Sequence, residues 1–294
     1  MNFIYEILGT VLNAIYKIIP DFGWSIIIFT AIIRLLLLPL TIKQQRSMVN
    51  MQKIQPELEK IQKKYANDKE KLSQETMKIY QENNINPMGG CLPLLIQMPI
   101  LIAVYNVIQK PVTYLLKIDI PSKVFDALKG AANTAGVGTE LDIVAFVNNN
   151  IDKANEALQK AGQSFDLSKL QIDFDFLGLN IGLTPKTGGD ILLYIIPVVC
   201  VITSFLVSKV GQMGQPKKSE NAQASQMNMM MYIFPFMTGY FCMILPAAMG
   251  IYWIAGNILQ MIQTVVLNKI MNKNSNEPLV IENDKKNKSE KKKK

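Results

Sequence analysis

The chain has 294 residues, of which 49% are apolar and only 18% are charged, and its formal net charge is +8. It contains no histidine, and its three cysteines, Cys91, Cys200 and Cys242, lack metal-ligand spacing, so we expect neither a metal nor a cofactor. The apolar residues gather in long uncharged runs, which argues against a soluble enzyme and indicates a membrane protein.

The first element that the sequence predicts is an amphipathic helix over residues 1–20. Apolar residues recur there at helical spacing, and polar residues fall between them. This pattern is typical of a helix that lies in the membrane interface. The segment lacks a basic start and a small-residue cleavage site; an uncleaved or poor signal sequence is the alternative reading.

Five apolar runs follow, each close to the ~20 residues that a helix needs to cross the hydrocarbon layer. We therefore predict an all-α, polytopic membrane protein with five transmembrane helices. The expected spans are residues 21–42, 91–110, 190–208, 229–246 and 247–268.

The loops between these spans carry unequal charge. Nine Lys or Arg residues lie in 43–90, three in 209–227 and nine in 268–294, whereas 117–189 holds seven Lys against nine acidic residues. Because basic loops stay inside, we expect a plasma-membrane protein with its N-terminus outside and its C-terminus in the cytoplasm.

Besides the N-terminal helix and the short cytoplasmic loop 209–228, three segments lie outside the expected spans. Residues 43–90 show two apolar stripes separated at Asn67–Asp68, which predicts a cytoplasmic helical hairpin whose stripes face each other or the membrane. The extracytoplasmic loop 111–189 is long enough to hold short helices, and Glu140–Leu158 is one candidate. The tail 269–294 is rich in Lys and Asn and is expected to be disordered and basic, suited to lipid headgroups, ribosomal RNA or mere solvation.

The spans contain one charged residue, Arg34, and no carboxylate to neutralise it within their apolar runs, which are Trp24–Ile42, Cys91–Ile108, Ile191–Ser208, Met229–Pro246 and Met249–Leu267. It lies ten residues after Trp24 and nine before Lys43, so a straight helix would hold it near mid-depth. An arginine there costs about 2.5–3.5 kcal/mol on insertion scales, which predicts a hydrated or polar-lined cavity. Snorkelling of the side chain to the interface is the alternative.

Polar side chains in the expected spans are candidates to line such a cavity. Thr30 precedes Arg34 by one helical turn, and Asn257, Gln260 and Thr264 share a face of the last span. Helix–helix hydrogen bonds that only hold the bundle together are the competing interpretation for each of them. The methionines around residues 227–243 suit either an adaptable apolar surface or simple contact with lipid.

The chain resembles a known family in a set of short motifs. These are Gly23–Ile28 leading through Arg34 to Pro39-Leu40-Thr41, then Gln55-Pro56, then Asn86-Pro87-Met88-Gly89-Gly90-Cys91-Leu92-Pro93-Leu94-Leu95-Ile96-Gln97-Met98-Pro99, and last Tyr252–Asn257. They are similar to those of the YidC membrane protein insertases. The similarity is strongest over about 22–110 and looser over 190–268, and in the external loop it covers only Phe176–Asn180.

This resemblance implies a five-helix core with a hydrophilic groove open to the cytoplasm and to lipid, with Arg34 at its centre. We accordingly place Thr30, Gln97, Trp253, Asn257 and Gln260 in the same substrate-binding groove. It also implies a chaperone and insertase, not an enzyme, that works alone or with the Sec translocon. The implied partners are nascent membrane proteins, the ribosome through the basic tail, and lipids. Relative to many members, the chain lacks a large extracytoplasmic domain, an additional N-terminal span and a lipoprotein signal.

Two other functions would also account for part of this pattern. A solute or anion transporter or channel would explain a lone arginine, but its coupling acid is missing from the apolar runs. An intramembrane enzyme would need a metal site or a catalytic triad, and the apolar runs offer no histidine, no carboxylate and no Gly-x-Ser-x-Gly elbow.

Overall fold

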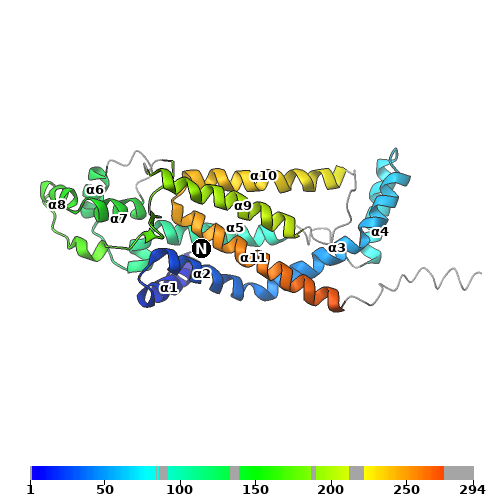
Figure 1. The fold of residues 1–294 in the computed structure, drawn as a ribbon, viewed down its shortest axis with the longest axis horizontal. Coiled ribbons are helices and arrows are strands. Elements are labelled where there is room, and N and C mark those ends of the chain that lie inside the picture. The colour runs from blue at the N-terminus through cyan, green and yellow to red at the C-terminus, as the bar shows by residue number, and fades with distance from the viewer. Residues whose placement is uncertain are drawn as a thin grey trace, which may run out of the picture.

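The computed structural model describes residues 2–83, 85, 92–132, 139–186, 190–211 and 222–274. Helices dominate this part of the chain, which confirms the all-α class (Figure 1). The basic tail beyond Asn274 and the whole of the Asn86–Cys91 segment lie outside the described residues.

The N-terminal helix α1 (Asn2–Ile18) packs against α5 (Leu92–Gln109), the short π-helical turn η2 (Val112–Leu116) and α2 (Phe22–Leu36). Its Asn13 amide donates a hydrogen bond to the carbonyl of Leu115 in η2. The inner face of α1 buries Leu12, whereas Phe3 is largely exposed. The amphipathic helix is therefore present, and its position in a membrane interface stays a prediction.

Helix α2 does not run through to residue 42 as one straight helix. It begins after Asp21, whose carboxylate accepts a 2.9 Å hydrogen bond from the Trp24 amide, and ends at Leu36. Helix α3 (Leu38–Lys64) then restarts with Pro39 in its first turn, a position where proline's missing N–H and fixed φ are tolerated. The two helix axes differ by 62° at this break.

Helix α3 and helix α4 (Lys69–Glu82) form a hairpin at the end of the molecule opposite α6–α8 (Figure 1). The Asp68 carboxylate accepts a hydrogen bond from the Lys71 amide and so caps α4. Ile54, Leu58, Ile79 and Tyr80 form a small core of their own between the two helices. The apolar stripes therefore face each other, although Met77, assigned to the second stripe, is half exposed.

The remaining long helices form the bundle. Helix α9 (Ile195–Gly211), preceded by the 3-10 turn η4 (Ile191–Tyr194), packs along both α10 (Ala222–Ile244) and α11 (Ala247–Asn274). Helix α11 also packs along α2 (Figure 1). The main core is continuous from α1 and α2 into α9, α11 and the α6–α8 region.

Two helical segments in the described residues are long and apolar enough to cross a membrane alone, Ile191–Gly211 and Ala247–Ile270. The bent pair α2–α3 makes a third if it counts as one span, and Gln97–Gln109 and Tyr232–Ile244 are shorter apolar helices. The chain is thus a multi-pass membrane protein, and the count of five spans stays a prediction.

The region between α5 and η4 holds α6 (Ser122–Ala131), α7 (Glu140–Asn149), α8 (Ile151–Lys160), the 3-10 turn η3 (Leu167–Leu170) and a hairpin of β1 (Asp175–Phe176) with β2 (Leu179–Asn180). The single helix expected over Glu140–Leu158 was wrong, because it is interrupted at Asn150, whose φ of −143° and ψ of 51° are not helical. The side chains of Asn149 and Asn150 bond the carbonyls of Ala145 and Phe146, which competes with continuation of the helix.

Candidate functional site

Arg34 lies in the last turn of α2 and is partly buried. Its Nη2 atom donates a hydrogen bond of 3.3 Å to Oε1 of Gln260 on α11. The carbonyl end of a helix carries partial negative charge, so its position in α2 favours the guanidinium cation. Arg34 of the first expected span therefore contacts Gln260 of the last one, as the hypothesis that both line one groove requires.

Gly256 lets the guanidinium lie directly against α11. A β-carbon at this glycine would be 3.2 Å from Arg34 Nη2 and 3.9 Å from Arg34 Nε. The same β-carbon would be 3.9 Å from the Thr30 methyl carbon. The missing side chain of Gly256 thus supplies the space that the arginine occupies.

Thr30 is almost fully buried beside this contact, but its hydroxyl does not serve Arg34. It donates a 2.6 Å hydrogen bond to the Ile26 carbonyl in its own helix. A threonine within a helix commonly donates such a bond to the backbone carbonyl four residues earlier. What Thr30 presents to α11 is a methyl group.

Tyr252, one turn before Gly256, lies on the same side of α11 as the arginine contact. It is buried and lies near the guanidinium of Arg34. Helix α11 also packs against α5, the helix that carries Gln97. The positions 252, 256 and 260 repeat every four residues and so share one face of α11.

Gln263 adds a second contact from α11 to α2. Its Nε2 atom donates a 3.4 Å hydrogen bond to the backbone carbonyl of Arg34. Its Oε1 atom is buried and has no hydrogen-bond partner among the described residues. Sequence reasoning missed Tyr252, Gly256 and Gln263, although the four-residue repeat that ends at Gln260 was available to find the first two.

Asn257 and Trp253 lie elsewhere on α11. The Asn257 amide donates hydrogen bonds of 3.0 and 2.9 Å to the hydroxyls of Thr203 and Ser204 on α9. Trp253 is partly buried and packs against the main apolar core. The described hydrogen bonds therefore join Arg34 to Gln260, but join none of Gln97, Asn257 and Trp253 to Arg34.

The charge of Arg34 has no carboxylate partner within the described part of the chain, where the single ion pair joins Lys160 to Glu156. A guanidinium has five N–H donors, and the bond to Gln260 is the one recorded for it among these residues. The remaining donors can serve an external acceptor. A cation held partly buried by amide and dipole contacts alone is suited to attract an anionic group.

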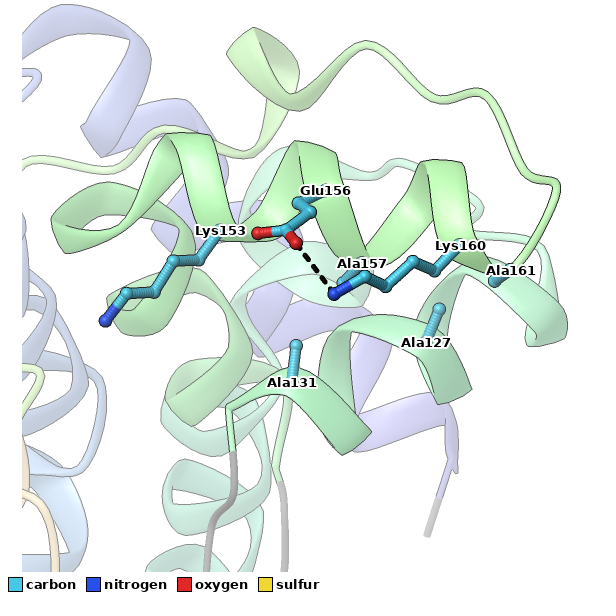
Figure 2. A pocket seen from close by; sticks show the side chains of 7 residues that line it. All are labelled: Ala127, Ala131, Lys153, Glu156, Ala157, Lys160 and Ala161. Carbon is cyan, nitrogen blue, oxygen red and sulfur yellow. Dashed lines mark ion pairs between the residues drawn. The ribbon is translucent and has the colours of Figure 1, made fainter.

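A surface hollow between α6 and α8 is separate from this arrangement. It is lined by alanines of both helices and by Lys153, Glu156 and Lys160 of α8 (Figure 2). The Lys160 ammonium lies 2.7 Å from the Glu156 carboxylate, and this hydrogen-bonded pair lowers the pKa of Glu156. None of the residues proposed for the groove lines this hollow.

Helices α5 and α10 have different neighbours in the bundle. In the described residues α5 packs against α1, α3, α7 and α11, whereas α10 packs against α9 and α11. No extensive contact joins α5 to α10 in this part of the chain.

Comparison with known proteins identifies relatives over most of the chain. The family model described as "60Kd inner membrane protein" matches residues 14–275. Membrane protein insertase YidC 1 of Listeria monocytogenes serotype 4b is 34% identical over 88% of this chain and 68% of its own length. Membrane protein insertase YidC of Fusobacterium nucleatum is 33% identical over 91% of this chain and 96% of its own length.

One solved structure also matches, described as an active YidC insertase with its first transmembrane domain resolved. The TM-score is 0.48 and the sequence identity is 24%. The match covers 90% of this chain and 45% of the solved chain.

Proposed function

This chain belongs to the YidC family of membrane protein insertases, and we propose that it inserts its clients through a polar groove centred on Arg34. The single observation that carries this mechanism is the partly buried guanidinium. It is bonded to the Gln260 amide, and no carboxylate neutralises it among the described residues. The groove would lie beside α2, α5 and α11, the helices that carry Arg34, Gln97 and Gln260.

The first step is capture of the client's translocating tail. A tail that crosses unaided must leave water for ~30 Å of hydrocarbon. In a partly buried site the effective dielectric is well below that of water, which strengthens the attraction between Arg34 and an acidic tail segment. The polar side chains proposed to surround the arginine are those of Gln260, Tyr252 and Gln97. They solvate the tail while it is in the groove.

The second step is release of the apolar segment into lipid. The free energy for this step comes from removing apolar surface from water, about 25 cal/mol for each Å². No covalent bond forms or breaks, and no nucleotide is consumed. The exposed apolar side chains of α10, among them Phe236 and Tyr240, provide a surface along which a client helix passes.

The clients are nascent membrane proteins, as insertase identity implies. We further propose that the chain works alone or beside the Sec translocon, that its basic tail binds the ribosome, and that lipids contact both ends of the groove. The α3–α4 hairpin would then face the cytoplasm, with the C-terminus on the same side and the N-terminus outside. The excess of basic residues in 43–90 supports this orientation.

The test compares Arg34→Ala and Arg34→Lys with wild type in liposomes. Two single-span clients are used that differ only in whether the translocated tail carries two acidic residues. We expect Arg34→Ala to lower insertion of the acidic client by about tenfold, equivalent to ~1.4 kcal/mol, and to affect the neutral client less. Arg34→Lys should retain part of the activity because it keeps the charge but not the bidentate fork.

The matched control is Arg46→Ala, which removes the exposed arginine of α3. It should insert both clients as wild type does. Equal insertion of the acidic client by wild type and Arg34→Ala contradicts the charge-attraction step. Rapid flux of small ions through the same liposomes would contradict the insertase groove and favour a channel.

A further inference from the structure

A strained turn next to the start of α2 exposes a large apolar side chain. In the β1–β2 hairpin, Phe176 pairs with Leu179, and Leu177 and Gly178 form the two-residue connection. Both connecting residues have positive φ, 55° at Leu177 and 78° at Gly178. Turns of this geometry favour Asn-Gly or Gly-Gly, and leucine rarely adopts a positive φ. The Leu177 side chain is nevertheless 81% exposed, so it gains no burial within the chain.

The hairpin is fixed to the beginning of α2. The Phe176 ring packs edge-to-face on Trp24 at 5.7 Å and against the backbone of Gly23, where a β-carbon would lie 2.2 Å from the ring. The Phe22 amide donates a 3.2 Å hydrogen bond to the Asp173 carbonyl just before β1. The position of Leu177 along the bundle axis is thus set by rigid contacts with the first turn of α2.

Other exposed apolar side chains occur at the same level. Ile18, at the end of α1, is 81% exposed, and Trp24, in the first turn of α2, is 48% exposed. Ile191 is 81% exposed and begins the apolar segment Ile191–Gly211, which is long enough to cross a membrane. Helix α2 and the α9 segment both begin at the end of the bundle that carries α6–α8 (Figure 1). Leu177 therefore continues a set of exposed apolar side chains at this end of the bundle.

Carboxylates at the same level each bind a backbone amide. Asp21 accepts from Trp24, Asp175 accepts from Gly178 at 2.9 Å, and Asp190 accepts from Leu192 at 2.9 Å. The Asp175 carboxylate accepts the hydrogen bond of the Gly178 amide, so this amide does not need a water molecule as its partner.

We propose that the Leu177 turn inserts into the membrane surface at the α6–α8 end, with the leucine side chain among the upper acyl carbons. Together with Ile18, Trp24 and Ile191 it forms a lipid-contacting rim around the starts of α2 and α9. The lipid recovers, by burying the side chain, the free energy that the positive φ of Leu177 costs. The rim holds the hairpin, and through Phe176 the first turn of α2, at a constant depth.

The direct test measures the depth of a tryptophan placed at the turn. The full chain carries Leu177→Trp with both native tryptophans replaced, Trp24→Phe and Trp253→Phe. It is reconstituted in phosphatidylcholine vesicles with and without lipid brominated near the top of the acyl chain. We expect brominated lipid to reduce emission about twofold, as for a side chain at the headgroup–acyl boundary. The matched control has Asn155→Trp in the same background, on the exposed face of α8, and should keep its emission.

A second measurement avoids removal of the native tryptophans. Leu177→Cys and Asn155→Cys are each labelled with a nitroxide, and wild type treated in the same way gives the background from the native cysteines. Oxygen should relax the label at position 177 more strongly than a water-soluble nickel chelate does, and the order should reverse at position 155. Equal quenching at both positions, or nickel relaxation at 177 as strong as at 155, overturns the proposal. Neither readout depends on Arg34 or on insertion activity.

Discussion

The guanidinium of Arg34 donates a 3.3 Å hydrogen bond to the side-chain carbonyl of Gln260, two residues that are 226 positions apart in the chain. The bond joins α2 to α11 and leaves most of the arginine donors free. It also fixes the guanidinium over Gly256. The chemistry proposed for the groove therefore depends on an amide, a neutral group, as the partner of the arginine.

Replacement of Gln260 by glutamate should inhibit the insertase while stabilising its fold. Gln260→Glu places a carboxylate beside Arg34, and a close pair in a partly buried site competes with an acidic client for the cation. We expect about tenfold slower insertion of the acidic-tailed client, equivalent to ~1.4 kcal/mol, and an unchanged or higher melting temperature. Gln260→Leu is the matched control, since it removes the bond without adding charge. An acidic client inserted normally by Gln260→Glu would exclude charge attraction at Arg34.

The size of the residue at position 256 should tune the position of the guanidinium. Gly256→Ala puts a β-carbon 3.2 Å from Nη2 of a flexible side chain, which can move by a few tenths of an ångström. We expect little loss of stability, because alanine favours a helix by about 0.8–1.0 kcal/mol over glycine. Gly256→Leu would displace the arginine and should lower insertion as Arg34→Ala does. Liposome assays beside thermal melts separate the two effects, and full activity in Gly256→Leu would contradict the assigned contact.

The contact between Gly23 and Phe176 should tolerate no side chain. In Gly23→Ala the new β-carbon would lie 2.2 Å from the Phe176 ring, which cannot rotate away while it packs on Trp24. We expect a destabilisation of about 1–3 kcal/mol, measured by thermal or denaturant unfolding in detergent. Adding Phe176→Ala should reduce the cost of Gly23→Ala by roughly half or more in a double-mutant cycle.

Gly130→Ala serves as the control for this experiment. Gly130 lies in α6, and a β-carbon there would meet nothing within 4 Å. This change should leave stability unchanged or raise it by up to about 1 kcal/mol through helix propensity. Equal effects of the two glycine substitutions would show that the packing of Phe176 on α2 is not as described.

Asn257 should prove to be a bundle residue. Its amide bonds two hydroxyls on α9, so Asn257→Ala should cost about 0.6–1.7 kcal/mol of stability, the range found for hydrogen bonds between membrane helices. Insertion per folded molecule should stay close to wild type for both clients. Thr203→Val tests the same bond from α9 and should be less than additive with Asn257→Ala. If Asn257→Ala instead lowers insertion of the acidic client selectively, Asn257 belongs to the groove.

Sequence alone located the central residue of the site but not its partners. Arg34 stood out because it is the one charge in the apolar runs of the expected spans. Asn257 and Gln260 were assigned to one face by spacing, yet three residues along a helix leave a 60° difference, enough for one to face α9 and the other α2. Gly256 escaped notice because its contribution is the absence of a side chain.

The break at Leu37 shows a different limit. Pro39 was visible as a possible kink, but hydropathy continues through residue 42 and gave one uninterrupted span. The chain changes direction here because Pro39 lies in the first turn of a new helix and not in the interior of a longer one. That choice is decided by the packing of α3 against α5 and α11. Hydropathy reports which residues avoid water, and it carries no information about the angle between successive segments.

Helix α3 has 27 residues, with Pro56 in its interior, and it starts four positions after Arg34 and ends at the tip of the α3–α4 hairpin. At 1.5 Å per residue its path is about 40 Å long. A proline inside a helix removes one backbone hydrogen bond and allows the helix to bend there. The path from Arg34 to the hairpin tip therefore includes the 62° change of direction at Leu37 and a second position, Pro56, at which α3 can bend. The hairpin can thus change its direction relative to the first turns of α3 without breaking the helix that connects it to Arg34.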